Sequence, residues 1–486
     1  MRSVLMYGTI ATLVLGLAAC AEPPAPTAPP RPSFATGRRG PAVFVTDVSR
    51  DVAAQDETPI AVNPRNTSNI LTGANDFNLN DGCAYNVSFD GGRTWSPTLP
   101  NGFIPGLTLF TNDPAIPGTG SYEIAGDPAV AFGPDGTAYF ACQAFSVTSP
   151  FPIALFVSRS TDGGLTWADG VHEKPVQVSQ WNGNGKSRGG NGQFPDHDAM
   201  TVDDNPDSPF YGSVYVTWVQ FSGLQGTHSP VLVAFSRDGA RSFSQPVKVT
   251  QGPVRNNQDA RIVIGPDGTL YLAFDNGVQG GKGTVNYVAV SRDGGVSWST
   301  PAAFSAYNNP VSLFPPFFNI SGSPFRAPGS YPAPAFDRAR NRLAVAYADI
   351  DTDGRAKIFV TSAPADAVSD PGQWASPVAL AGSGDRFGAE LDIAANGRYD
   401  LSFYDRSYTG NALVDLTYAM SGDGGATWST ARVSASGFDP SQYRTRFIGD
   451  YNGIVSLAGS ALLAWTGIGT QNGVTNFDIY FGSVAP

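Results

Sequence analysis

The feature of this sequence that most limits its fold is a short motif that returns along the whole chain. Four copies agree closely: "SFDGGRTWSP" from Ser88, "STDGGLTWAD" from Ser160, "SRDGGVSWST" from Ser291 and "SGDGGATWST" from Ser421. A weaker copy, "SRDGARSFSQ", starts at Ser236. A turn motif that recurs at regular distances predicts a chain built from similar units that pack against one another.

A second repeat fills the other half of each unit. It is a segment of alternating apolar and polar residues, typical of a β-strand, and most copies continue through a turn into a second strand. With a spacing of roughly 64 residues, the two repeats predict seven units, a number and length that suit the blades of a β-propeller. The seven copies occupy residues 57–64, 127–142, 197–204, 259–274, 331–347, 388–403 and 450–465.

Each unit reads as four strands, with the motif in the turn between the third and the fourth. The seventh unit has no fourth strand after "NFDIYFGSVAP", which ends the chain. The N-terminal "PAVFVTDVS", residues 41–49, can supply that strand and close the ring, which removes the unpaired edge of an open sheet. We therefore predict an all-β fold, a seven-bladed β-propeller over residues 41–486 whose last blade is completed by the N-terminal strand.

The composition agrees with many short strands joined by tight turns. Glycine (56) and proline (39) are abundant, and charged residues make up only 15% of the chain. The formal net charge of −11 argues against nucleic acid and against an anionic membrane surface as partners. A local basic patch could still bind an acidic glycan. We expect a monomer.

The N-terminus reads as a targeting segment and is left out of the fold. An arginine and an apolar stretch lead to "LAAC", which resembles the bacterial lipobox and would make Cys20 the lipidated first residue of the mature protein. The alternative is an ordinary secretory signal with a chance cysteine. We predict a lipoprotein signal peptide at 1–20 and a proline-rich tether at 21–40, so that an exported protein is anchored to the bacterial cell envelope or surface.

Two further cysteines remain, Cys83 and Cys142. In an exported protein a pair of cysteines predicts one disulfide bond. Two buried free thiols are the alternative.

The repeated motif resembles that of the Asp-box, or bacterial neuraminidase repeat, proteins, whose consensus is Ser-x-Asp-x-Gly-x-Thr-Trp. In such a turn the aspartate can accept hydrogen bonds from the turn's own amides, the glycines permit positive φ, and the tryptophan packs between blades. In that family the box lies on the far side of the propeller from the active site. The resemblance implies that the motif is structural and that a site must be sought at the opposite face.

The start of each first strand opens at that opposite face, the channel mouth. When the seven first strands are aligned, each has one residue at the mouth. Two residues after that position, the aligned strands have Arg261 and Glu390. Crowded carboxylates repel one another, so that at least one should have the raised pKa that a general acid requires. A solvated ring of carboxylates that binds loop amides is the alternative. The equivalent mouth positions are Glu57, Asp127, His197, Asp259, Tyr331, Gly388 and Asp450.

Long loops also reach the mouth. The segment 181–194 is basic and glycine-rich, and the segment 314–331 is aromatic and contains Arg326. Aromatic side chains that cover sugar faces, with arginines that bind a carboxylate or sulfate, are typical of an acidic-sugar site. Loops that only pack over the face are the alternative.

The resemblance to sialidases implies particular roles. Those enzymes bind the substrate carboxylate with three arginines and use a tyrosine nucleophile activated by a glutamate, with an aspartate as acid and base. Carried onto this sequence, Tyr451 would be the nucleophile, Glu390 its activator and Asp127 the acid. The predicted substrate-binding residues are Arg261, Arg386, Arg406, Arg446, Asp259 and Asp450.

The leading functional hypothesis is an exo-sialidase-like glycoside hydrolase that acts on an extracellular glycan, with an acidic glycan as one possibility. Two alternatives stay open: a polysaccharide lyase on a uronic-acid polymer, with His197 or Tyr331 as base, and a propeller that binds a glycan or a protein without catalysis. No cofactor is required by this chemistry. A calcium ion is a weaker hypothesis, because "DIDTDG" starts like a calcium loop with Asp349, Asp351 and Asp353 but has Val360 where such a loop ends in glutamate. A polar turn is the alternative.

Overall fold

The structure is a computed structural model. No helix among the residues that it describes is long and apolar enough to cross a membrane. The predicted signal peptide at 1–20, the lipidation site Cys20 and the tether at 21–40 lie outside the described residues. The described residues are 41–77, 81–97, 102–113, 115–148, 150–168, 173–181, 194–221, 229–252, 254–277, 281–311, 325–443 and 446–486.

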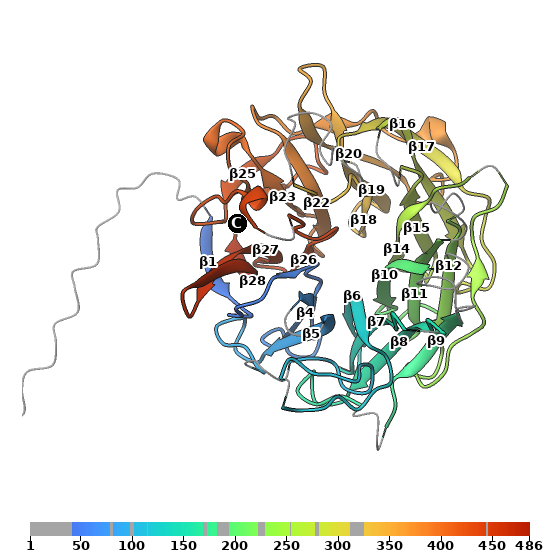
Figure 1. The fold of residues 1–486 in the computed structure, drawn as a ribbon. Helices are drawn as coiled ribbons and strands as arrows, with labels where there is room; N and C mark the ends of the chain where they lie inside the picture. The colour runs from blue at the N-terminus through green and yellow to red at the C-terminus, as the bar shows by residue number, and fades with distance from the viewer. Residues whose placement is uncertain are drawn as a thin grey trace, which may run out of the picture. The chain divides into compact units, whose positions relative to one another are not determined.

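Seven four-stranded sheets are arranged as blades around a common axis (Figure 1). Neighbouring strands within every blade are antiparallel, as expected where short turns join consecutive strands. The predicted seven-bladed β-propeller is therefore confirmed. In the described part of the chain, three short 3-10 helices interrupt the loops of the fifth to seventh units: η2 (Pro371–Gln373), η3 (Ser407–Thr409) and η4 (Pro440–Gln442).

The blades follow one another in chain order. The first is less regular than the others, because its innermost strand is split into β2 and β3 and its outer edge is made only by isolated bridges. The strands, blade by blade, are β2 (Gln55–Asp56), β3 (Ile60–Val62), β4 (Ile70–Phe77) and β5 (Asp81–Ser88); β6 (Ile124–Phe132), β7 (Ala138–Phe145), β8 (Ile153–Ser160) and β9 (Val176–Trp181); β10 (Phe194–Val202), β11 (Val214–Phe221), β12 (Val231–Ser236) and β13 (Val247–Lys248); β14 (Gln258–Ile264), β15 (Leu270–Asp275), β16 (Gly281–Ser291) and β17 (Ala302–Asn309); β18 (Ala333–Asp337), β19 (Arg342–Ile350), β20 (Ala356–Pro364) and β21 (Val378–Ala379); β22 (Arg386–Ile393), β23 (Tyr399–Asp405), β24 (Asp415–Ser421) and β25 (Ser429–Arg432); β26 (Gly453–Ser456), β27 (Ala461–Gln471), β28 (Val474–Ala485) and β1 (Ala42–Asp47).

The outermost strand of the seventh blade comes from the start of the described chain. β1 runs antiparallel to β28, with Ala42 opposite Ala485 and Asp47 opposite Tyr480. Strands from the two ends of the propeller sequence thus share one sheet.

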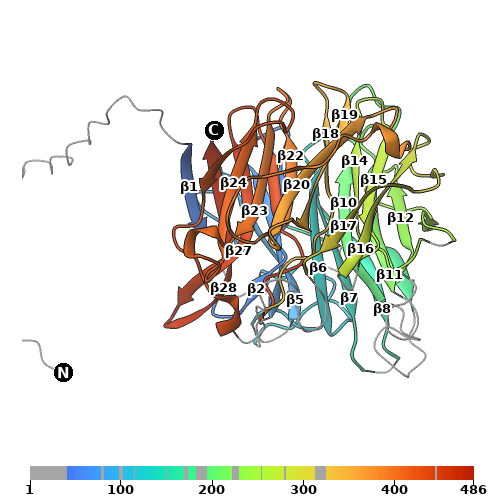
Figure 2. The same ribbon diagram turned by 90° about the horizontal axis from the view of Figure 1, so that it is seen from above.

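The strands run between two faces of the ring, as the view turned by 90° shows (Figure 2). The innermost strands begin at one face, which we call the channel mouth, and third strands such as β8 end at the opposite face, where the repeated motif forms the next turn. The motif and the channel mouth therefore lie at opposite ends of the blades.

Hydrogen bonds within the turn explain why the motif contains an aspartate. Asp90 Oδ1 accepts from the backbone N–H groups of Arg93 and Thr94, both at 2.9 Å, and Oδ2 accepts from the Thr94 hydroxyl at 2.7 Å. The bonds from Thr94 lower the pKa of Asp90 to about 2. The prediction that the motif is structural is confirmed, because this aspartate binds its own turn. Four further aspartates accept the same two bonds, from the backbone N–H and the hydroxyl of the residue four positions later: Asp162, Asp238, Asp293 and Asp423.

The aromatic residue of the motif packs into the seam between blades. Trp167 lies edge-on to Tyr85 of the preceding blade, with ring centroids 5.6 Å apart. Trp95 contacts Phe481 in the same way at 5.3 Å. Where the fifth unit lacks the motif, Trp374 stacks on Phe304 at 4.1 Å. The hydrophobic core consequently lies between adjacent blades.

A disulfide bond joins Cys83 on β5 to Cys142 on β7. The two cysteines are 59 residues apart in the sequence and belong to the first and second blades. The predicted disulfide is formed, and it ties together two neighbouring units.

Candidate active site

A β-bulge marks the innermost strand of several blades at the channel mouth. The pairing register shifts in the blades that begin with β6, β10, β14 and β22. At these bulges Asp127, His197 and Asp259 have φ of 55°, 52° and 46°, and Gly388 has φ of 62°. Glu57, between β2 and β3, has φ of 58°. Left-handed backbone is strained for residues other than glycine, and such strain gathers at functional sites.

The bulges bring side chains of different blades together around His197. Its ring Nδ1 lies 3.4 Å from Asp259 Oδ1, and its Nε2 lies 3.1 Å from Asp450 Oδ2. The rings of Tyr331 and Tyr451 stand edge-on to it at centroid distances of 4.8 and 6.0 Å. Burial opposes the charged imidazole, but the bonds to Asp259 and Asp450 raise the pKa of His197 well above its ordinary value. The ring is therefore a cation held between two carboxylates.

Two partly exposed carboxyl groups lie beside this histidine. Asp127 Oδ2 accepts the backbone N–H of His197 at 3.0 Å, and Asp196 Oδ2 accepts from the Gln258 amide at 2.7 Å. Burial, followed by the charge of Asp196, raises the pKa of Asp127 to about 7. Burial also raises the pKa of Asp196. Because ionised Asp196 opposes the ionisation of Asp127, Asp127 stays partly protonated near neutral pH.

The side-chain amide of Asn75 links two acids of the first blade, Asp56 and Glu57, to Asp127. Asn75 Nδ2 donates to Glu57 Oε2 at 2.7 Å and to Asp56 Oδ1 at 3.1 Å, and its Oδ1 accepts the backbone N–H of Asp127 at 2.8 Å. Burial raises the pKa values of both Asp56 and Glu57 well above the ordinary range, and neighbouring carboxylates raise them further. The predicted crowding of acids with raised pKa values is thus found in the structure.

Two arginines reach this cluster. Arg261 binds Asp259, with Nε 3.1 Å from Oδ1, and its Nη1 binds Glu390 Oε2. Arg326 Nη2 binds Asp450 Oδ2, and its guanidinium lies 4.0 Å from the centre of the Phe447 ring. Although burial opposes ionisation, Arg326 and His197 hold the pKa of Asp450 below its ordinary value. Both guanidinium groups are therefore already paired with carboxylates.

The other predicted arginines do not join the cluster. Arg386 Nε binds Asp405 Oδ2 at 2.9 Å within its own blade. Arg406 binds the carbonyl of Asn411. Arg446 is exposed, and its carbonyl accepts the backbone N–H of Arg326 at 2.7 Å. These three arginines therefore lie outside the cluster of acids, and their role in binding the substrate stays a prediction that these contacts do not support.

The predicted pairing of Glu390 with Tyr451 is also corrected. The Tyr451 hydroxyl donates to the carbonyl of Pro128 at 2.9 Å. Glu390 instead binds Arg261 and accepts the backbone N–H of Asn452 at 3.4 Å. Burial, followed by the charge of Glu57, raises the pKa of Tyr451 well above its ordinary value. Tyr451 is thus a buried hydrogen-bond donor rather than a phenol activated by Glu390.

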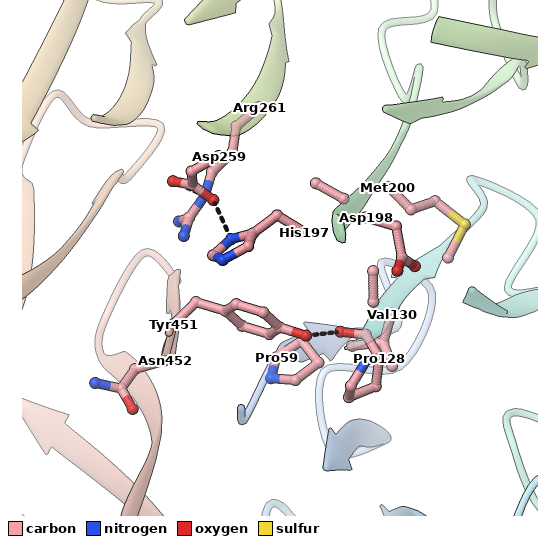
Figure 3. Close-up of a pocket in the computed structure, with 12 residues that line it drawn as sticks. Pro59, Pro128, Val130, His197, Asp198, Met200, Asp259, Arg261, Tyr451 and Asn452 are labelled. Atoms are coloured by element: carbon pink, nitrogen blue, oxygen red, sulfur yellow. Dashed lines mark hydrogen bonds and ion pairs between the residues drawn. The ribbon is translucent and has the colours of Figure 1, made fainter. Parts of the chain in front are cut away.

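A cavity of about 130 Å³ lies directly below the ring of mouth residues. Figure 3 shows His197, Asp198 and Asp259 around it, with the ring of Tyr451 on the other side. A second cavity shares Ala199, Met200 and Arg261 with the first. The channel is therefore hollow below the mouth, where a ligand can meet the clustered acids.

The predicted calcium ligands do not converge. Asp349 Oδ1 accepts the backbone N–H of Asn308 at 2.8 Å, and Asp351 accepts that of Thr352 at 2.7 Å. Asp353 forms an ion pair with Lys357 at 3.1 Å. Within the described ranges, no group of three or more histidines, cysteines and acids could hold a metal ion. The segment is a polar turn, and the calcium hypothesis was wrong for these residues.

Several site residues were not singled out from the sequence. Asp196 precedes a predicted ring position and Asp198 follows it, while Asn75 lies on the second strand of its blade. A pair of acids around one ring position, "DHD", was the available signal for the first two. Residues 182–193 and 312–324, which include most of the two loops predicted to reach the mouth, lie outside the described residues.

Comparison with known proteins gives structural neighbours only. No protein-family model matches the chain. No curated protein matches it in sequence. A protein of unknown function from Dyadobacter fermentans is 14% identical, with a TM-score of 0.49, over 78% of this chain and 98% of the other. An α-L-arabinofuranosidase from Fusarium graminearum is 13% identical, with a TM-score of 0.41, over 73% and 91%. The NanB sialidase from Streptococcus pneumoniae is 10% identical, with a TM-score of 0.41, over 90% and 70%.

The chain's own seven sheets define its class, a seven-bladed β-propeller. Its channel mouth carries clustered acids around a charged histidine.

Proposed function

We propose that this protein is a glycoside hydrolase that cleaves an extracellular glycan at the channel mouth. The observation that supports this most directly is the pair of partly exposed carboxyl groups, Asp127 and Asp196. The charge of Asp196 helps to raise the pKa of Asp127 to about 7. A carboxyl group with a pKa of about 7, beside a second carboxyl group, supplies the acid and the carboxylate that glycoside hydrolysis needs.

In this proposal Asp127 is the general acid. The glycosidic C–O bond breaks as Asp127 gives its proton to the leaving oxygen. Ionised Asp196 stabilises the positive charge that develops at the anomeric carbon. A water molecule then adds to that carbon, and the proton that it loses restores Asp127.

His197 is a positioning residue in this scheme. Its backbone N–H binds Asp127, while its ring is fixed by Asp259 and Asp450. The left-handed backbone at 197 is therefore held by bonds on both sides of the residue. This arrangement keeps the acid in one place without a direct role for the imidazole in the reaction.

The exo-sialidase subtype has less support than hydrolysis in general. Of the four arginines predicted to bind a substrate carboxylate, Arg261 alone contacts the cluster of acids, and Asp259 and Glu390 already bind it. A clamp of three arginines is not formed by the described residues.

Elimination by a lyase is a weaker candidate. A lyase needs a neutral base beside the proton that it removes. His197 is held charged by two carboxylates, and burial raises the pKa of Tyr331 well above its ordinary value. Neither group is suited to accept a proton at neutral pH, which favours hydrolysis.

A screen tests the proposal. The purified propeller would be incubated with chromogenic glycosides and with neutral, amino and uronic-acid oligosaccharides, and the products separated by chromatography. New reducing ends without ultraviolet absorbance would support hydrolysis. Unsaturated products that absorb in the ultraviolet would support the lyase instead, and binding without any cleavage would support a glycan- or protein-binding propeller.

We also propose that the protein is exported and held at the membrane by lipid on Cys20. Cys20→Ser should move the protein from the membrane fraction to the soluble fraction, because acyl chains supply the anchor. The measurement is fractionation of expressing bacteria followed by immunoblotting. A Cys20→Ser protein that stays with the membranes would exclude the lipid anchor.

A further inference from the structure

We infer that the cavity below the channel mouth accepts a positively charged group, the free ammonium of an amino sugar in the glycan. This inference rests on the proposed function and names its substrate class. The pairing of charges around the cavity and two features of the cavity wall all favour an ammonium group as the ligand.

The cations at the mouth are already paired. His197 lies between Asp259 and Asp450, Arg261 binds Asp259 and Glu390, and Arg326 binds Asp450. Four other carboxyl groups at the mouth make no ion pair with any described residue, so that no cation among the described residues is left to balance them when they ionise. These groups are Glu57, Asp127, Asp196 and Asp198.

Asp198 is the carboxyl group that lacks a partner most clearly. It is only 4% exposed, and it lines the cavity (Figure 3). Its Oδ2 has no hydrogen-bond partner among the described residues. A buried carboxyl oxygen without a partner is costly, so a ligand that donates a hydrogen bond to it gains affinity. Burial and the nearby charge of Asp127 raise the pKa of Asp198, which a bound cation would reverse.

An aromatic ring completes the cavity wall. Tyr451 lines the cavity, and its hydroxyl is fixed by the carbonyl of Pro128 at 2.9 Å. A carboxylate next to an aromatic ring is a setting in which proteins bind ammonium groups, because the ring face and the carboxylate both attract the cation. The cavity of about 130 Å³ has room for the amine-bearing edge of a sugar.

An acidic sugar fits this cavity poorly. Its carboxylate or sulfate would meet carboxyl groups that lack counter-ions, while the arginines are occupied. A sugar hydroxyl could bind Asp198 but brings no positive charge to carboxyl groups that lack a counter-ion. The amine is the substituent that both supplies the missing donor and balances the charge.

Three oligosaccharides with one backbone test the inference. The β-1,4-linked tetramers of glucosamine, N-acetylglucosamine and glucose differ only in an amine, an acetamide or a hydroxyl at the same carbon. We expect the glucosamine tetramer to bind at least about tenfold more tightly than the other two in isothermal titration calorimetry, and the difference to shrink as salt is raised.

Asp198→Asn should remove most of this preference, because it keeps the shape of the side chain and loses the charge. Asp207→Asn is the matched control, since Asp207 is an exposed carboxylate on the loop that follows β10. The control should bind like the wild type. Circular dichroism and thermal melting of both variants would check that the fold is kept.

Equal affinity for the three tetramers, or no binding of the glucosamine tetramer, would overturn the inference. So would tighter binding of a tetralysine peptide, because the cavity would then recognise charge without the sugar. A preference for the amine that survives in Asp198→Asn would also overturn it. The proposed hydrolysis is tested by separate outcomes. Amine-selective binding without cleavage would contradict the proposed hydrolase. Cleavage of neutral sugars alone would contradict only this inference.

Discussion

Asp127→Asn should lower kcat by about 10²–10⁴-fold on the substrate that the screen identifies, because the amide cannot give a proton to the leaving oxygen. Asparagine tolerates the left-handed backbone found at this position, where φ is 55°. Its side-chain oxygen can still accept the backbone N–H of His197. The free energy of unfolding should therefore change little, and KM should change much less than kcat.

The pH dependence of kcat/KM is a second test of Asp127 as the general acid. A general acid works only while it is protonated, and the pKa of Asp127 is raised to about 7. Wild-type kcat/KM should therefore fall as the pH rises through about 7, and the residual activity of Asp127→Asn should lack that fall. Asp207→Asn should behave like the wild type. An unchanged alkaline limb in Asp127→Asn would show that another group is the acid.

Trp167→Ala should destabilise the propeller by about 3–5 kcal/mol, because it leaves a cavity in the seam between the first two blades. Trp167 is 7% exposed and packs edge-on against Tyr85 and Phe140, with ring centroids 5.6 and 5.9 Å away. Denaturant unfolding followed by fluorescence measures the loss. Since the motif is at the opposite face from the mouth, activity per folded molecule should persist.

Val296→Ala is the control for the tryptophan. Val296 belongs to another copy of the motif but is 58% exposed, so its truncation should change the free energy of unfolding by less than about 0.5 kcal/mol. If Trp167→Ala instead lost activity while its melting temperature stayed unchanged, the motif would be part of the site and not of the scaffold.

The fold could be predicted from the sequence because each blade repeats the same local signals. The aspartate of the motif, as at Asp90, binds amides three and four residues later, so its environment is encoded within one turn. The innermost strands could be aligned for a related reason. A bulge with left-handed backbone places one residue at the mouth in the blades of Asp127, His197 and Asp259, and an alternating strand follows each of them.

The details of the site depend on contacts between blades, which no local pattern carries. Arg326 binds Asp450 across 124 residues, and His197 binds Asp450 across 253. Arg386 was predicted in the site from the resemblance to sialidases, yet Asp405 of its own blade holds it. The partner of a buried charge is set by the closure of the ring, so its identity could not be read from neighbours in the chain.

The shared sheet of β1 and β28 has a consequence for the protein's synthesis. β1 precedes every other strand of the propeller in the sequence, and its partner β28 follows them all. During translation β1 must therefore wait, unpaired, until the residues of β28 have been made. Its residues "AVFVTD" include Val43 and Phe44, which are 39% and 43% exposed even in the finished sheet. Until then such a strand needs protection from premature pairing with other chains, and closing the last blade is the step that ends this need.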